Sequence, residues 1–310
     1  MLGDIGGSDH RFGWIDSPGA AISRVVSHAG SGDLGAEVRG YLSMQRLPQP
    51  ASASLGIAAP VLGDVVTMTN GPVRFSTREL ERELGVESLL VMNDFAALAQ
   101  ALPSLRDGEA RSVGGGTAAA GGAMALVGPG TGFGVSGLLT VPGGHVPVVG
   151  EGGHASIAAS DEREGEVLAV LRRRFGRVSA ERVLSGPGIA NLHAALRQLA
   201  GVAAEGLEPA QVTQRALDGS DDSCREALDL FFAFLGAVAG DVALTLGARG
   251  GVYIGGGIVA RLGAAIDRSR FRERFEAKGS YSPYLAGIPT RVLVDSSGLA
   301  LRGADAALGS

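Results

Sequence analysis

The sequence contains one cysteine, Cys224, and one lysine, Lys278. A single cysteine excludes an internal disulfide and any cysteine-rich zinc site. The phosphate loop G-x-x-x-x-G-K-[ST] does not occur, so a Walker-type nucleotide site is also excluded. Basic residues are outnumbered, with 27 Lys and Arg against 32 Asp and Glu. This balance argues against a nucleic-acid partner, which binds a clustered basic face. The short basic run at 171–175 is instead predicted to be the solvent-facing end of a helix.

Long apolar runs are also rare. The most apolar stretch covers residues 230–246, with Asp241 inside it and Asp229 directly before it. These charges favour a buried core helix over a membrane span. Charged residues between Asp4 and Arg11 interrupt any apolar run near the start, so no secretory signal is expected. The sequence therefore predicts a cytoplasmic protein with no membrane partner.

Glycine is abundant, at 50 of 310 residues, which indicates many tight turns. The chain is longer than one ordinary domain, and glycine-rich strand turns occur in both halves without a fixed repeat. We therefore expect two α/β lobes. The smaller is predicted to combine residues 1–104 with 295–310, and the larger to cover 105–294. A small-residue loop over 108–122 is expected at the lobe boundary.

Two glycine-rich turns follow predicted strands, GDIGGS at 3–8 and GPGTGFG at 128–134. Backbone amides in such turns can point together at phosphate oxygens. A strand is predicted after the second turn, and the dinucleotide-binding fingerprint requires a helix there, so that fingerprint is excluded. Taken singly, each turn is also typical of an ordinary hairpin.

Residues 75–86 carry the signals of a complete helix. Ser76 can cap its start, and Glu79 follows three residues later, as in a capping box. Leu80 and Leu84 share one face, and Gly85 ends the helix.

The buried strand predicted at 88–92 delivers Asn93 and Asp94 at its carboxyl end, and a helix begins immediately afterwards. Open α/β sheets bind their ligands at such junctions. Asp94 could alternatively be a simple helix N-cap.

Three further polar residues lie beside glycines or predicted element ends: Glu151, His154 and Glu181. Carboxylates accept hydrogen bonds from sugar hydroxyls, and a histidine can donate or accept. These three residues are too few to form a metal site. Glu181 follows Ser179, a candidate N-cap, so it could instead be a helix-start acid without a ligand.

Eight ordered segments of the chain resemble those of the bacterial glucokinases, from Gly3 to about Ser280. They read GDIGGSDHRF, IAAPVLGDVVTMTN, VMNDFAALAQALP, GPGTGFGVSGL, GEGGHASIA, VSAERVLSGPGIANLH, YIGGGIV and FEAKGSY. The resemblance implies a two-lobed α/β fold of the actin-like ATPase (hexokinase/ribonuclease H-like) type, with ATP and sugar bound in the cleft between the lobes. It also implies Mg²⁺ as a cofactor and commonly a homodimer.

By motif match, the resemblance implies a role for each group of residues. The first phosphate turn comprises Gly3, Asp4, Ile5, Gly6, Gly7 and Ser8, with Asp4 near Mg²⁺ through water. The second phosphate turn comprises Gly130, Thr131 and Gly132, and the adenosine-side motif comprises Gly255, Gly256 and Gly257. The sugar-contacting positions are Asn93, Asp94, Glu151, His154 and Glu181, and Asp94 is the catalytic base.

The implied reaction is ATP-dependent phosphorylation of glucose to glucose 6-phosphate. Three alternatives remain open: another hexose as substrate, a sugar-sensing regulator without turnover, and polyphosphate as donor. One departure from the family pattern concerns the nucleotide. Asp9 stands where the family usually has Asn, and its charge is expected to disfavour ATP unless Arg11 or Mg²⁺ compensates.

Overall fold

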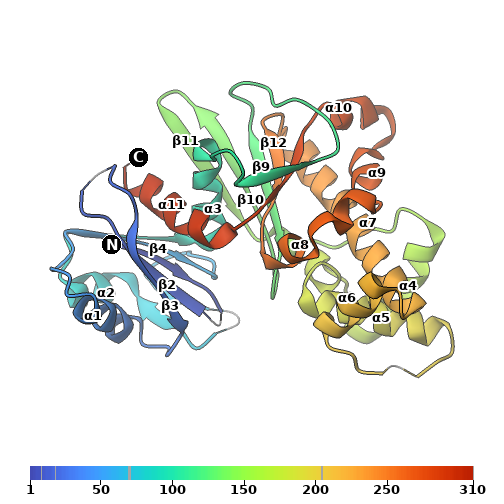
Figure 1. The fold of residues 1–310 in the computed structure, drawn as a ribbon, viewed down its shortest axis with the longest axis horizontal. Coiled ribbons are helices and arrows are strands. Elements are labelled where there is room, and N and C mark those ends of the chain that lie inside the picture. The colour runs from blue at the N-terminus through green and yellow to red at the C-terminus, as the bar shows by residue number, and fades with distance from the viewer. Residues whose placement is uncertain (8, 18, 69–70, 204, 310) are drawn as a thin grey trace. The chain divides into compact units, whose positions relative to one another are not determined.

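The computed structural model describes residues 1–7, 9–17, 19–68, 71–203 and 205–309 (Figure 1). Contacts divide the chain into two compact units. The first unit comprises Met1–Arg106, Leu138–Gly150 and Asp295–Ser310, and the second comprises Asp107–Gly137 and Glu151–Val294. The sequence placed lobe boundaries near the first and last of these borders, but it gave no sign that 138–150 belongs with the first unit.

The first unit alternates strands and helices. Its elements are β1 (Leu2–Ile5), β2 (Asp9–Trp14), β3 (Ser23–Ala29), α1 (Leu34–Met44), β4 (Ser52–Ile57), β5 (Val65–Thr67), β6 (Arg74–Ser76), α2 (Thr77–Leu84), β7 (Ser88–Asn93), α3 (Asp94–Ala101), β11 (Gly144–Gly150) and α11 (Ser296–Leu308). Strand β10 (Phe133–Val141) runs across the border between the units.

A five-stranded sheet in the order β3-β2-β1-β4-β7 is the centre of the first unit. β1 pairs with β2 in an antiparallel hairpin, whereas β1, β4 and β7 run parallel. Parallel strands end at the same edge of a sheet, so the residues that follow β1 and β7 share one edge.

Helices cover both faces of this sheet. On one face, Leu34 and Val38 of α1 and Leu80 of α2 pack in one core with Leu55 and Ile57 of β4. On the other, α3 and α11 lie side by side (Figure 1), and Leu301 of α11 packs on Leu2. This three-layer arrangement holds the edge that carries the polar residues.

The second unit holds most of the helices. Its elements are β8 (Ala110–Val113), β9 (Met124–Pro129), the start of β10, α4 (Glu162–Phe175), α5 (Gly186–Leu199), α6 (Pro209–Asp218), α7 (Asp222–Leu246), β12 (Gly251–Ile254), α8 (Gly257–Leu262), α9 (Phe271–Glu276), α10 (Ser282–Ala286) and β13 (Thr290–Leu293). Short 3-10 turns include η2 (Gly152–His154) and η3 (Ala180–Arg182).

A second sheet has the order β11-β10-β9-β12-β13-β8. β9, β12 and β13 are parallel, and β8 pairs antiparallel with β13. β8 lies within the segment predicted to be a loop, because Ala110–Val113 finds a partner strand that is about 180 residues distant in sequence. Local composition carries no information about such a partner.

Helix α7 is the core helix that the apolar run predicts. It is the one described helix long and apolar enough to cross a membrane, and 72% of its apolar window is buried inside the structure. Phe231, Phe234 and Leu235 are fully buried in the core cluster of this unit. This packing in the core explains why α7 is apolar on nearly all sides.

Candidate active site

The first glycine-rich turn joins β1 to β2. Asp4 is on β1 opposite Arg11 of β2, and the amide of Gly6 donates to the Asp9 carbonyl oxygen at 3.0 Å. Gly3 and Ile5 lie on β1 as well, and Gly7 follows in the turn. Ser8 lies outside the described residues. The turn is thus a hairpin, and its polar members are at the shared sheet edge.

Asn93 and Asp94 mark the change from β7 to α3. The Asn93 side chain is the N-cap: its Oδ1 accepts from the amides of Phe95 at 2.9 Å and Ala96 at 3.2 Å. Asp94 is the first helical residue, and its Oδ1 also accepts from the Phe95 amide at 2.9 Å. The interpretation of Asp94 as a simple N-cap is therefore wrong, because Asn93 fills that position.

Asp4 and Asp94 influence each other electrostatically. Burial and the charge of Asp94 raise the pKa of Asp4 to about 7, and the guanidinium of Arg11, 3.6 Å away, partly opposes that rise. Asp4 is therefore partly protonated at neutral pH, and a cation bound beside it would favour its charged form.

Glu151, His154 and Glu181 come together in the second unit. Glu181 on η3 lies 4.0 Å from Nδ1 of His154 on η2, and the His154 amide donates to the Glu151 carbonyl at 3.0 Å. Gly153, between them, packs so closely on β10 that a Cβ would overlap the Phe133 carbonyl oxygen. Only glycine allows this approach.

The second glycine-rich turn connects β9 to β10 and contacts this cluster. The Gly130 amide donates to the Gly132 carbonyl at 2.8 Å, closing the turn around Thr131. The Phe133 amide donates to Oε2 of Glu181 at 3.0 Å. Glu181 is thus held by the turn that the sequence assigns to phosphate, so these two predicted sites are directly linked.

Gly255, Gly256 and Gly257 connect β12 to α8. Gly256 has φ of +77°, and a Cβ there would overlap the Pro129 carbonyl oxygen, so this position requires glycine. The Gly255 amide donates to the Val127 carbonyl at 2.8 Å. The third predicted motif therefore lies against the end of β9, where the second turn begins.

A pocket of about 1120 Å³ opens beside these two turns, entirely within the second unit. Gly130 and Thr131 form one edge, Gly257 and Arg261 another, and Pro187 of α5 a third. Its volume is sufficient for a nucleotide-sized ligand.

Three residues outside the predicted set hold this site together. Ser185 caps α5 and donates to the Glu181 carbonyl at 2.8 Å, and the Gly186 amide donates to the Gly130 carbonyl at 2.9 Å. Arg177 donates to the His154 carbonyl at 2.6 Å. The segment VSAERVLSGPG contained two of them, but the contacts of Gly186 and Arg177 join segments remote in sequence, which leaves no local signal.

One cluster of described residues has the composition of a metal site, in which ligand atoms of His193, Asp221 and Cys224 lie within 4.8 Å of one another. Structural roles account for it. Asp221 caps α7 by accepting from the amides of Ser223 and Cys224. His193 lies 3.1 Å from the Ser223 hydroxyl, and burial raises the pKa of the Cys224 thiol to about 11.

Comparison with known proteins places the chain among sugar kinases. The sequence model of the glucokinase family matches residues 1–310. The chain is 53% identical to a glucokinase of Aromatoleum aromaticum, with 95% of this chain and 90% of that protein covered. It is 48% identical to a glucokinase of Chromobacterium violaceum, with 96% and 85% covered.

Comparison with solved structures also identifies glucokinases as similar to this chain. A glucokinase from an Antarctic psychrotroph matches with a TM-score of 0.88 and 36% identity, covering 99% of this chain and 98% of that one. A ROK family glucokinase from Streptomyces griseus, in complex with glucose and AMPPNP, shares the fold alone at 18% identity, with a TM-score of 0.65 over 98% and 96% of the chains. The α/β fold is thus the actin-like ATPase fold that the sequence predicted.

Proposed function

The chain belongs to the glucokinase family and phosphorylates glucose with ATP to give glucose 6-phosphate, and we propose that Asp94 is the base that activates the sugar hydroxyl. The observation that carries this proposal is the β7–α3 junction. Because Asn93 does the capping, Asp94 lies in the first helical turn, where the helix N-terminus favours an ionised carboxylate. A general base of this kind contributes about 10²–10⁴-fold to the rate.

The reaction then requires one proton transfer and one phosphoryl transfer. Asp94 accepts the proton of the 6-hydroxyl as that oxygen attacks the γ-phosphorus. The new oxygen–phosphorus bond forms while the bond to the β–γ bridging oxygen breaks, and ADP leaves with that electron pair. Since phosphoryl transfer needs little covalent help, positioning and charge stabilisation account for most of the catalysis.

Four side chains are proposed to position the sugar: Asn93, Glu151, His154 and Glu181. The contact between Glu181 and the Phe133 amide supports this role, because it links sugar binding to the turn beside the nucleotide pocket. A sugar ring held by several hydrogen bonds would present its 6-hydroxyl in a fixed direction.

The phosphates and Mg²⁺ are proposed to bind the glycine turns and Asp4. The raised pKa of Asp4 supports a cation there, because a cation would stabilise the carboxylate that burial and the charge of Asp94 disfavour. Mg²⁺, when bound, would neutralise phosphate charge. Backbone amides of the two turns would supply the remaining positive potential, which is consistent with a chain that has one lysine.

The adenosine part of ATP is proposed to occupy the 1120 Å³ pocket of the second unit. Gly130 and Thr131 lie at its edge, so phosphates held by that turn would continue from a nucleoside inside the pocket. Gly257 and Arg261 line the same pocket, in agreement with the adenosine-side role of residues 255–257.

We further propose that the two units are the two lobes of the kinase and that the enzyme is a cytoplasmic homodimer. Exposed apolar side chains on β10 and β11 support self-association: Leu139, Val141, Val146 and Val149 are 38%, 38%, 49% and 57% exposed. A solution mass of about twice 31.3 kDa by light scattering would support a dimer, and the monomer mass would contradict it.

The first experiment measures ADP release with Mg·ATP and a panel of hexoses. Asp94→Asn is expected to lower kcat by at least about 10²-fold while glucose still binds in calorimetry. Asp107→Asn, the same change at an exposed aspartate outside the site, serves as the control and should keep wild-type turnover.

Substantial turnover by Asp94→Asn would remove Asp94 from the role of base. Preference for another hexose would correct the substrate, and turnover with polyphosphate but not ATP would correct the donor. Glucose binding without any turnover by the wild-type chain would favour a sugar sensor.

A further inference from the structure

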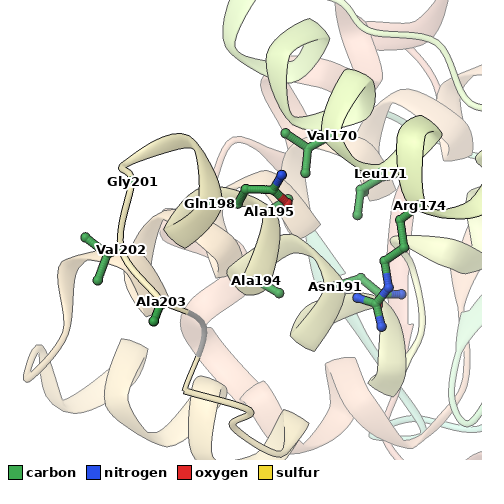
Figure 2. Close-up of a pocket in the computed structure, with 10 residues that line it drawn as sticks. All are labelled: Val170, Leu171, Arg174, Asn191, Ala194, Ala195, Gln198, Gly201, Val202 and Ala203. Atoms are coloured by element: carbon green, nitrogen blue, oxygen red, sulfur yellow. The ribbon is translucent and has the colours of Figure 1, made fainter.

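A second pocket, of about 490 Å³, lies between helices α4 and α5 of the second unit (Figure 2). Val170 and Leu171 of α4 and Ala194 and Ala195 of α5 give it an apolar lining. Its polar groups are few, chiefly Arg174 of α4 and Asn191 and Gln198 of α5. Neither glycine-rich turn contributes to it, so it is separate from the proposed nucleotide pocket.

Arg174 is the charged residue among those that line this pocket, and it belongs to a group of arginines at the end of α4. Five arginines crowd the end of α4 and the segment after it, and in the described part of the chain none of them forms an ion pair: Arg172, Arg173, Arg174, Arg177 and Arg182. The guanidiniums of Arg174 and Arg182 lie 4.8 and 4.5 Å from the same Phe175 ring centroid. Two like charges against one ring repel each other, and a bound anion would relieve that repulsion.

The outer wall of the pocket is held in place without a ligand. Gly201, Val202 and Ala203 follow α5 and line the pocket. The Arg197 guanidinium donates to the Ala203 carbonyl at 3.2–3.3 Å and pairs with Glu205 at 3.1 Å. A ligand would therefore enter a preformed site and lose little free energy in ordering it.

A chain of hydrogen bonds connects this pocket to the proposed sugar site. Arg174 extends toward Asn191 (Figure 2) and donates to its Oδ1 at 3.4 Å, a long bond that is easily given up. The side-chain Nδ2 of Asn191 in turn donates to the Arg182 carbonyl at 3.0 Å. Arg182 adjoins Glu181, so the position of η3 depends partly on Asn191.

We propose that this pocket is an effector site for a small organic anion with an aliphatic body, and that its occupation weakens glucose binding through Asn191 and η3. The oxyanion would pair with Arg174, and the aliphatic body would lie on Val170, Leu171 and the alanines of α5. Pairing with the anion takes Arg174 from Asn191, which frees Asn191 to leave the Arg182 carbonyl. The coupling rests on the proposed role of Glu181, whereas the anion site itself does not.

The binding test compares three probes by calorimetry in the absence of nucleotide and sugar. 4-Methylpentanoate is expected to bind with a Kd of about 1 mM, the range for a ligand of about eight non-hydrogen atoms. Its neutral amide and inorganic phosphate should each bind at least about 10-fold more weakly, since one lacks the charge and the other the apolar body. Equal binding of acid and amide, or of acid and phosphate, would overturn the proposed recognition.

Two variants locate the site. Arg174→Gln should weaken 4-methylpentanoate at least about 10-fold, whereas Arg173→Gln, the neighbouring exposed arginine that does not line the pocket, should leave the Kd within about 2-fold. Loss of binding in both variants, or in neither, would overturn the assignment to this pocket. Both substitutions are at solvent-exposed positions, so both proteins are expected to fold.

Coupling is tested by titrating glucose with and without saturating 4-methylpentanoate, in the wild-type and Asp94→Asn proteins. The glucose Kd should rise about 5-fold, and by reciprocity glucose should weaken the anion by the same factor. Asn191→Ala should raise the glucose Kd by itself and abolish the further effect of the anion. A glucose Kd that does not respond to the bound anion would overturn the coupling. Failure of glucose to bind at all would contradict the sugar site instead, with the anion site judged by its own titrations.

Discussion

Asn93 and Asp94 are adjacent, yet they have separate tasks. Asn93 satisfies two amides at the start of α3, a role that asparagine fills as well as aspartate does. That arrangement leaves Asp94 in the first turn of the helix, at the sheet edge where Asp4 also lies. Burial, and after it the charge of Asp94, raise the pKa of Asp4. A charge added to this edge should therefore affect nucleotide binding.

Asp9 is such a charge. It begins β2 directly after the first glycine turn, and its carbonyl closes that turn. Asp9→Asn removes one negative charge while keeping the size of the side chain. We expect the KM for Mg·ATP to fall about 3-fold, the size of an exposed charge effect of under 1 kcal/mol.

The effect should shrink at 0.5 M salt, where such interactions are screened. Steady-state kinetics at two salt concentrations measures both quantities. Asp107→Asn, at an exposed position outside the site, should leave the KM unchanged. An ATP KM that rises in Asp9→Asn would show that the carboxylate helps to build the turn.

The sequence supplied the candidate site residues, but not the residues that support them. Asp94 could be proposed because a buried strand followed by polar residues and a helix is a local pattern. Ser185 and Arg177 act on the carbonyls of Glu181 and His154, and the second of those contacts joins segments 23 residues apart. The Arg177 contact depends on the folded backbone, so no local pattern predicts it.

Among the elements, the helices with clear end signals were predicted well. Helix α2 begins after Ser76, whose hydroxyl accepts from the Glu79 amide, and ends at Gly85 in the left-handed conformation, as predicted. β8 was missed because an edge strand of four residues depends on its neighbour β13. Helix capping can thus be predicted from the local sequence, whereas strand pairing over long separations cannot.

Helix α7 offers a test of capping. Its N-cap, Asp221, accepts from the Ser223 hydroxyl and from two amides, which lower its pKa to about 2. A carboxyl group whose pKa is depressed in the folded state stabilises the fold above its ordinary pKa of 3.8, and that contribution is lost as the pH falls toward 2. Asp221→Ala should lower the free energy of unfolding by about 1–2 kcal/mol at pH 7.

About half of that difference should have disappeared by pH 3, as measured by urea denaturation across this range. Asp222→Ala is the matched control, since Asp222 is the next residue and its side chain is 87% exposed. Asp222→Ala should lower the free energy of unfolding by at most about 0.5 kcal/mol. A difference between Asp221→Ala and wild type that stays constant from pH 7 to pH 3 would contradict the capping role of the charge.

At the scale of the whole molecule, the residues proposed to bind the two ligands are distributed differently between the units. The pocket proposed for adenosine is walled only by residues of the second unit. The residues proposed for glucose come from both, since Asn93 and Asp94 belong to the first unit and Glu151, His154 and Glu181 to the second. Composition could not predict that residues 138–150 belong to the first unit, because this grouping depends on contacts that form only in the folded chain.

This division predicts different patterns of amide hydrogen exchange for the two ligands. ADP should slow exchange most strongly in the segments that wall the pocket, at 130–131, 186–189, 208–218 and 257–262, because a bound ligand suppresses local opening where it makes contacts. Glucose should slow exchange in both units, at 91–96 in the first and at 151–155 and 179–184 in the second. The Asp94→Asn protein should show the same glucose pattern, since it loses the base and keeps the sugar contacts. Protection by glucose confined to one unit would separate Asn93 and Asp94 from the other three residues, and the proposed sugar site would have to be redrawn around the protected set.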